Sequence, residues 1–434
     1  MRKRRNKDMY IDYSKSYLYR RRSRGSKIAG IIIVVILAFV FGIGTYYAVR
    51  IKTGGEYRLN RKHDMADNNE ENSAEIIPSP VITTAPINDD TGEEEVVDES
   101  DTRTPVRVKG LYVTSRAIMD KRDEIIEIAD TTEINALVID VKDDNGRITF
   151  QMDSPKAQEI GATTNTISDI DALMRLLKIK NIYPIARIVA FKDPYLAEQR
   201  HELAIKNKDG SLYRDNNGEC WVNPYEKEVW DYLIEVSTKA AEAGFMEIQF
   251  DYIRFSTGKG MSNADFGPLA EEKTKEDIII EFTQYAYESL KPLGVFVSAD
   301  VYGTIISSSI DAGLVGQNYV EMSKYLDYIC PMIYPSHFAD GNYGVEHPDL
   351  EPFNIIRKVL RASKNKLNEI PEGEHRAIVR PWLQDFTATW IKNYQEYGPS
   401  QIREQISGVY VVGYSEWLLW NASCNYTVDA LRKE

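Results

Sequence analysis

Between residues 105 and 434, short runs of apolar and β-branched residues alternate with longer segments whose apolar residues recur at helical spacing. The strand-like runs cover residues 110–114, 136–140, 183–188, 247–251, 295–300, 328–333, 376–381 and 408–413. The helical patterns cover residues 120–131, 168–180 with Ser168 as the expected N-cap, 226–243, 271–290, 317–326 and 352–362. Such alternation is typical of parallel strands joined by helical crossovers.

Eight strand–helix units predict a fold of the α/β class, namely a closed (β/α)8 TIM barrel. The alternative is a doubly wound open sheet. No strand-like run is followed by the Gly-x-Gly-x-x-Gly turn of a dinucleotide-binding sheet, so the barrel is favoured.

The first 104 residues differ from the rest of the chain. Residues 28–49 contain no charged side chain and are long enough to cross a bilayer as a helix. Residues 1–27 are strongly basic, which favours a cytoplasmic N-terminus. A cleaved signal peptide is the alternative, but the apolar run is too long and no Ala-x-Ala-like site follows it.

These features predict four parts of the chain. They are a basic cytoplasmic tail (1–27), a single transmembrane anchor in the lipid bilayer (28–49), a disordered acidic linker (50–104) and an extracytoplasmic barrel domain (105–434).

Charge and residue counts exclude several functions. The net charge is −13, and the basic tail suits anionic lipid, so we expect no nucleic-acid partner. Cys220, Cys330 and Cys424 are too few for a disulfide framework, although a Cys220–Cys424 bridge is left open. The five histidines lack metal-binding spacing, so we expect no metal site and no cofactor.

In a barrel of this type, reacting groups lie at the C-terminal ends of the strands and in the loops that follow. Polar and aromatic residues stand at these positions here. The candidates are Asp140, Lys142, Arg187, Trp221, Asp251, Arg254, Asp300, Tyr334, His337, Trp382, Asp385 and Trp417. Aromatic rings stack on the apolar faces of pyranoses, and polar side chains bond their hydroxyl groups. The set therefore predicts a carbohydrate site.

Asp251 and Asp300 are the candidate catalytic pair. Glycosidic cleavage needs one protonated acid for the leaving oxygen and a second carboxylate that acts as nucleophile or as base. The two residues end neighbouring predicted strands, so they could face one site. A structural role for Asp251, in which it bonds Arg254, is the alternative.

The other candidates are predicted to bind substrate, and several have a structural alternative. Asp140 could form an ion pair with Lys142 that orders the rim of the barrel. Arg187 could bind substrate or neutralise a neighbouring carboxylate. Asp385 could be a substrate ligand or a cap.

Seven phrases of the barrel region resemble a bacterial family of glycosyl hydrolase domains that is placed near the alpha-amylase-like barrels. The phrases are ALVIDVKDDNG (136–146), IYPIARIVAFKD (182–193), WVNPY (221–225), EIQFDYIRF (247–255), VSADVYG (297–303), PMIYPSH (331–337) and RPWLQDF (380–386). The resemblance implies a TIM barrel.

The resemblance also implies roles for three aspartates. Asp251 corresponds to the nucleophile of alpha-amylase-like enzymes, Asp300 to the acid/base and Asp385 to an assisting carboxylate. The chain departs from that pattern because Asp300 stands where those enzymes have Glu, and Gln249 stands where they have Arg.

The sequence as a whole predicts a membrane-anchored, extracytoplasmic glycoside hydrolase that acts on a cell-envelope or extracellular polysaccharide. The alternative is a non-catalytic glycan-binding barrel tethered to the cell surface.

Overall fold

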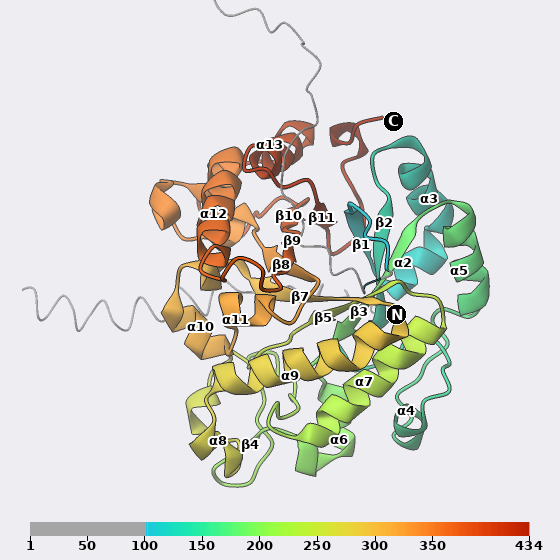
Figure 1. The fold of residues 1–434 in the computed structure, drawn as a ribbon, viewed down its shortest axis with the longest axis vertical. Coiled ribbons are helices and arrows are strands. Elements are labelled where there is room, and N and C mark those ends of the chain that lie inside the picture. The colour runs from blue at the N-terminus through green and yellow to red at the C-terminus, as the bar shows by residue number, and fades with distance from the viewer. Residues whose placement is uncertain (1–100, 102, 434) are drawn as a thin grey trace, which may run out of the picture. The chain divides into compact units, whose positions relative to one another are not determined.

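A closed ring of parallel strands forms the centre of the protein, which is described by a computed structural model covering residues 101 and 103–433 (Figure 1). The strands of the ring are β1 (Lys109–Val113), β2 (Ala136–Lys142), β3 (Tyr183–Val189), β5 (Glu247–Asp251), β7 (Phe296–Tyr302), β8 (Tyr328–Met332), β9 (Ile378–Val379), β10 (Trp382–Gln384) and β11 (Trp417–Trp420). The ring closes because β10 pairs with both β8 and β11, and β11 pairs with β1.

β9 and β10 together make the seventh strand of the ring. Pro381, which has no N–H group to donate, lies between them and interrupts the ladder. The fold is therefore the predicted eight-stranded parallel barrel.

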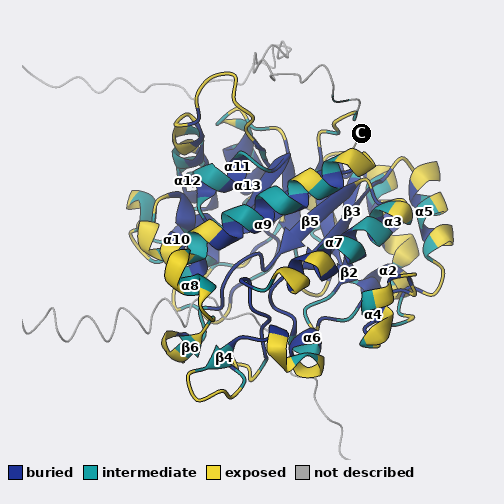
Figure 2. Cartoon of the chain, turned by 60° about the horizontal axis from the view of Figure 1, so that its bottom comes forward, coloured by how far each residue is buried: buried dark blue, intermediate teal, exposed yellow. Residues whose placement is uncertain are grey.

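Helices surround the ring, and the longer ones bury one face each. The helices are α2 (Ser115–Asp120), α3 (Arg122–Thr131), α4 (Pro155–Glu159), α5 (Ile170–Ile179), α6 (Pro194–Gln199), α7 (Lys227–Glu242), α8 (Leu269–Glu272), α9 (Lys275–Leu290), α10 (Ser309–Val315), α11 (Tyr319–Ser323), α12 (Pro352–Leu367) and α13 (Pro399–Tyr410). Figure 2 shows the strands of the ring almost wholly buried, whereas α7 and α9 have buried residues on one side and less buried residues on the other. A small antiparallel pair, β4 (Lys206–Asn207) and β6 (Ala264–Asp265), lies outside the barrel.

Local sequence signals explain where several helices begin. Thr274 precedes α9, and its hydroxyl accepts the N–H of Asp277 while the Asp277 carboxylate accepts the N–H of Thr274. Helix α5 was predicted to start with Ser168 as its cap, but Asp169 has that position and accepts the N–H of Ala172. Asp and Ser are equally good caps, so their order alone did not decide the boundary.

The eighth predicted strand, residues 408–413, is wrong, because residues 399–410 form helix α13 and only a turn follows it. Pro399 opens this helix, and Ile402, Ile406 and Val409 are buried at helical spacing. The strand that completes the barrel is the next apolar run, β11, whose first three residues are buried.

A buried ion cluster fills the N-terminal end of the barrel. Arg380 Nη1 donates to both oxygens of Glu247 at 2.8 and 2.9 Å, and Arg380 Nε donates to Glu416 Oε2 at 2.8 Å. Glu416 comes after the predicted eighth strand (408–413) in the sequence, but it precedes β11 and so lies at the N-terminal end of the barrel.

The predicted tail (1–27), anchor (28–49) and nearly all of the predicted linker (50–104) lie outside the described residues. Among residues 101 and 103–433, no helix is long and apolar enough to span a membrane. Cys220, Cys330 and Cys424 are all buried free thiols, so the Cys220–Cys424 bridge that the sequence left open is not formed.

Candidate active site

Asp251 and Asp300 occupy matching positions on neighbouring strands. Phe250 of β5 pairs with Ala299 of β7, so the residues that follow them stand side by side near the C-terminal ends of these strands. Neighbouring strands lie about 4.8 Å apart, and residues in register point to the same side of a sheet. The structure therefore brings the two predicted catalytic residues together.

Asp251 is held by a guanidinium group. Arg187 donates to Asp251 Oδ2 from Nε at 3.0 Å and from Nη2 at 2.6 Å. The backbone N–H of Tyr252 donates to Asp251 Oδ1 at 2.6 Å. Both oxygens of the carboxylate thus accept charge-assisted or backbone hydrogen bonds, which fix its orientation and balance its negative charge.

Arg187 also bonds two further carboxylates. Its Nη1 donates to Asp140 Oδ1 at 2.7 Å, and its Nη2 donates to Asp144 Oδ1 at 3.0 Å. Burial acts against the charge of Arg187, but Asp144, Asp251 and Asp140 together raise its pKa well above the ordinary value. Burial, opposed by the charge of Arg187, raises the pKa of Asp140 to about 6. Arg187 is therefore the centre of a carboxylate network and stays charged.

Asp300 has a different environment. Its Oδ1 accepts the side-chain N–H groups of Gln249 and Trp382, each at 2.6 Å. Burial, helped by the negative charge of Asp251, raises the pKa of Asp300 well above its usual range, although the bond from Trp382 acts in the other direction. The surroundings of Asp300 therefore favour its protonated form, whereas its neighbour Asp251 is bound to a cation.

The backbone turns sharply after Asp251. Tyr252 has a φ of 50°, in the left-handed region that bulky residues rarely adopt. Such a conformation costs roughly 1–2 kcal/mol and persists where packing fixes it. Tyr252 is buried, and its turned N–H group reaches back to the Asp251 carboxylate.

A cationic and aromatic cluster lies beside this turn. The guanidinium carbon of Arg254 is 5.1, 4.9 and 4.6 Å from the ring centroids of Trp221, Tyr252 and Tyr302. The indole N–H of Trp221 donates to Asp215. Trp221 and Arg254 thus adjoin the residue that follows Asp251, whose own carboxylate accepts two bonds from Arg187.

Tyr334 and His337 follow β8 and join an aromatic group. The Tyr334 ring lies 5.2 Å from that of His337, 6.0 Å from Phe386 and 5.7 Å from Trp420, measured between centroids. His337 Nδ1 is hydrogen-bonded to the hydroxyl of Ser336. These rings follow different strands but meet at the same end of the barrel.

Three predicted site residues, Lys142, Asp385 and Trp417, form contacts that stabilise the fold. The first of them is Lys142. A β-bulge between Asp140 and Lys142 shifts the register, and Lys142 Nζ bonds the carbonyl of Val189 and the carboxylate of Asp193. The predicted Asp140–Lys142 ion pair is therefore wrong. Because Lys142 is fully buried in these contacts, it is not available to bind a substrate.

Asp385 and Trp417 are the other two predicted site residues whose contacts stabilise the fold. Both carboxylate oxygens of Asp385 accept bonds from Thr427, one from its N–H and one from its hydroxyl, so Asp385 fixes the C-terminal segment. Trp417 starts β11 at the N-terminal end of the barrel, where its indole donates to the hydroxyl of Tyr410. Trp417 was predicted to lie at the C-terminal end of the barrel because residues 408–413 were the predicted eighth strand, and that prediction is wrong.

The structure brings three further residues to the site that the sequence did not single out as candidates. The Tyr112 hydroxyl donates to Asp140 Oδ2 at 2.8 Å, and Asp144 completes the carboxylates around Arg187. Gln249 lies two residues before Asp251 on β5, which places both side chains on the same face of that strand. This period-two spacing could have placed Gln249 at the site from the sequence alone. No comparable pattern indicated Tyr112, because its strand ends in apolar residues.

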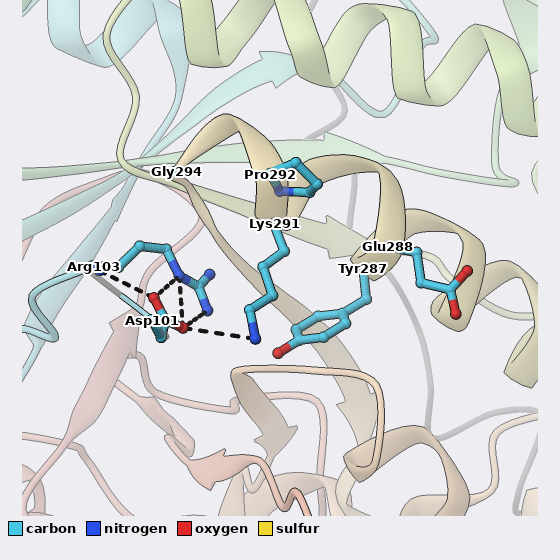
Figure 3. Close-up of a pocket in the computed structure, with 7 residues that line it drawn as sticks. All are labelled: Asp101, Arg103, Tyr287, Glu288, Lys291, Pro292 and Gly294. Carbon is cyan, nitrogen blue, oxygen red and sulfur yellow. Dashed lines mark hydrogen bonds and ion pairs between the residues drawn. The ribbon is translucent and has the colours of Figure 1, made fainter. Parts of the chain in front are cut away.

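Among residues 101 and 103–433, no three or more His, Cys, Asp or Glu side chains are placed so that they could hold a metal ion. A cavity of about 460 Å³ lies elsewhere, beside the start of β7, and Figure 3 shows its lining. The lining residues are Asp101, Arg103, Tyr287, Glu288, Lys291, Pro292 and Gly294. None of the predicted site residues lines this cavity.

The arrangement offers two adjacent carboxyl groups with different partners. One is bound to a guanidinium group and can act as an anion, and the other is buried and can donate a proton. Such a pair suits the cleavage of an acetal, in which the leaving oxygen takes a proton while the opposite side of the carbon is attacked or stabilised.

Known proteins resemble this chain in sequence or in fold. A family model described as "Putative glycosyl hydrolase domain" matches residues 110–426. A hypothetical protein from Ruminiclostridium thermocellum ATCC 27405 is 40% identical, with 44% of this chain and 97% of that chain covered and a TM-score of 0.41. The PgaB (BpsB) glycoside hydrolase domain from Bordetella bronchiseptica is 13% identical, with 76% and 99% covered and a TM-score of 0.54. No curated protein matches the sequence.

Proposed function

The chain belongs to the family described as "Putative glycosyl hydrolase domain", and from this membership we propose that its barrel hydrolyses glycosidic bonds with Asp251 and Asp300 as the reacting carboxyl groups. In this proposal Asp300 protonates the leaving oxygen. Asp251 attacks the anomeric carbon or activates a water molecule.

The contrast between the two carboxyl groups carries the proposal. They occupy matching positions on neighbouring strands, yet Arg187 donates twice to Asp251 while burial raises the pKa of Asp300. Two carboxyl groups whose surroundings differ in this way can share the work of base and acid.

We further propose that the substrate is a polysaccharide of the cell envelope or the extracellular space. The support is the uncharged run of residues 28–49 and the basic tail before it, which fit a single membrane anchor with the barrel outside. Protease treatment of intact cells would degrade the barrel if it faces outward, and protection of the barrel until lysis would contradict this.

Asp251→Asn is the first test of the reaction. It should lower the release of reducing ends from a susceptible polysaccharide by roughly 10²–10⁴-fold, the range expected for loss of such a group. A panel that includes peptidoglycan, chitin and starch identifies the susceptible polymer. The matched control is Asp209→Asn, which changes an exposed aspartate outside the site and should retain activity.

Asp300→Asn separates the two roles. It should lose most activity on natural glycosides but much less on aryl glycosides, whose leaving groups need little protonation. Equal losses on both substrates would remove Asp300 from the role of acid. If wild-type protein binds glycans but releases no sugar from any polymer, the barrel is a glycan-binding domain instead.

A further inference from the structure

A row of aromatic rings extends from the proposed acid to the protein surface. It begins at Trp382, whose indole donates to Asp300, and continues through Tyr112, Trp420 and Phe386 to Trp390. Successive ring centroids are 6.5, 6.4, 5.3 and 5.9 Å apart. We call these five residues the aromatic row.

Exposure increases along the row. Trp382 is 2% exposed and Tyr112 7%, Trp420 and Phe386 are partly exposed, and Trp390 is 41% exposed. The inner rings therefore serve as packing, whereas the outer rings present apolar surface to solvent. Large indole rings are costly to expose, and a grouped exposed apolar surface commonly marks a binding site.

The outermost ring is held in place by its neighbours. Phe386 and Trp390 are nearly parallel, with an angle of 16° between their planes. The His337 ring meets Trp390 edge-on at 6.4 Å and Phe386 at 6.2 Å. A ring fixed from two sides offers a flat surface that loses little conformational freedom when a ligand stacks on it.

We propose that Phe386 and Trp390 form an outer sugar-binding platform, so that the protein acts on a polymeric glycan and not on mono- or disaccharides. This inference rests on the proposed glycan-cleaving function. A chain whose reacting bond lies at Asp300 extends toward the outer rings of the aromatic row, and the apolar face of a more distant pyranose stacks on Trp390. The platform thus determines which chain lengths bind well.

A nearby residue provides a matched control. Tyr394 lies in the same loop and is 44% exposed, close to the exposure of Trp390. Within the described part of the chain it has no ring contact with the aromatic row. Tyr394→Ala therefore removes an exposed aromatic ring from this loop without removing the platform.

The test measures binding by calorimetry with the full-length protein carrying Asp251→Asn, which prevents cleavage. The probes are hexasaccharides of N-acetylglucosamine and of α-1,4-linked glucose, with the corresponding disaccharides. Trp390→Ala should weaken binding of the preferred hexasaccharide about tenfold, as expected for one lost stacking contact, and leave disaccharide binding unchanged. Trp390→Phe should restore most of the affinity.

Three outcomes would overturn the platform. They are unchanged hexasaccharide affinity in Trp390→Ala, an equal loss in Tyr394→Ala, and the absence of hexasaccharide binding by the protein with intact Trp390. Failure of the proposed reaction is distinguishable from these three outcomes. If glycan binding depends on Trp390 but the wild-type protein hydrolyses no glycan, only the catalytic proposal is contradicted.

Discussion

Asp251 and Asp300 show how two identical side chains acquire different properties from their contacts. Both lie near the ends of neighbouring strands, but the guanidinium of Arg187 faces one and the indole of Trp382 faces the other. The sequence could place the two aspartates because strand ends are recognisable. It could not identify Trp382 as the partner of Asp300, because 82 residues separate them.

The bond from Trp382 leads to a prediction about pH. The indole N–H stabilises the ionised form of Asp300 and so lowers its pKa, against the larger effect of burial. Trp382→Phe removes this bond, and the pKa of Asp300 should rise further. Because the acid must be protonated, activity is lost as pH rises through this pKa. The alkaline fall in kcat/KM should therefore move to higher pH.

The pH–rate profiles of wild type and variant measure this shift. Trp417→Phe is a suitable control, since it deletes an indole N–H that donates to Tyr410 at the other end of the barrel. Its alkaline limb should match that of the wild type. A limb that moves to lower pH in Trp382→Phe would contradict the proposed role of Asp300.

Among the elements, seven of the eight barrel strands could be predicted, because each is an apolar run and six of them have a helical pattern after them. Residues 408–413 were wrongly predicted as a strand because their β-branched residues favour one, whereas residues 408–410 are the last residues of helix α13, which begins at Pro399 and buries one face. Tertiary packing outweighed local propensity. The β-bulge that redirects Lys142 could not be predicted from the sequence either, because it depends on the register between β2 and β3.

The ion cluster at the N-terminal end of the barrel should be essential to stability. Arg380→Met leaves Glu247 and Glu416 buried without their cation. Loss of one partner from a buried pair typically costs about 3–5 kcal/mol. Urea denaturation should show a decrease of this size in the free energy of unfolding.

Arg200→Met is the comparison for that experiment. Arg200 pairs with Glu202 and Glu228, whose side chains are 60% and 50% exposed, so its removal should change stability far less. Similar losses for Arg200→Met and Arg380→Met would show that the buried cluster has no special effect.

At the scale of the whole molecule, the segment before β1 is fastened to the N-terminal end of the barrel. Arg103 donates to the carbonyl of Val295 at 2.7 Å and to both oxygens of Asp327 at 2.7 and 2.9 Å. These two residues immediately precede β7 and β8. The guanidinium carbon also lies 4.3 Å above the ring of Phe296.

Arg103→Ala should release this segment without affecting the reaction. Amide hydrogen exchange in residues 103–108 should become faster, while activity stays at the wild-type level. Arg107→Ala is the control, because Arg107 is exposed and its side chain has no ion pair within the described residues. Loss of activity in Arg103→Ala would mean that this contact influences the distant carboxyl groups.

The Arg103 contact has a consequence for orientation. It ties the incoming chain to the ends of β7 and β8 that are opposite to Asp300. The chain therefore enters the barrel at its base, at the end opposite to the proposed acid. A protein fused in front of this segment would accordingly join the molecule at the end farthest from the reacting carboxyl groups and should leave them uncovered.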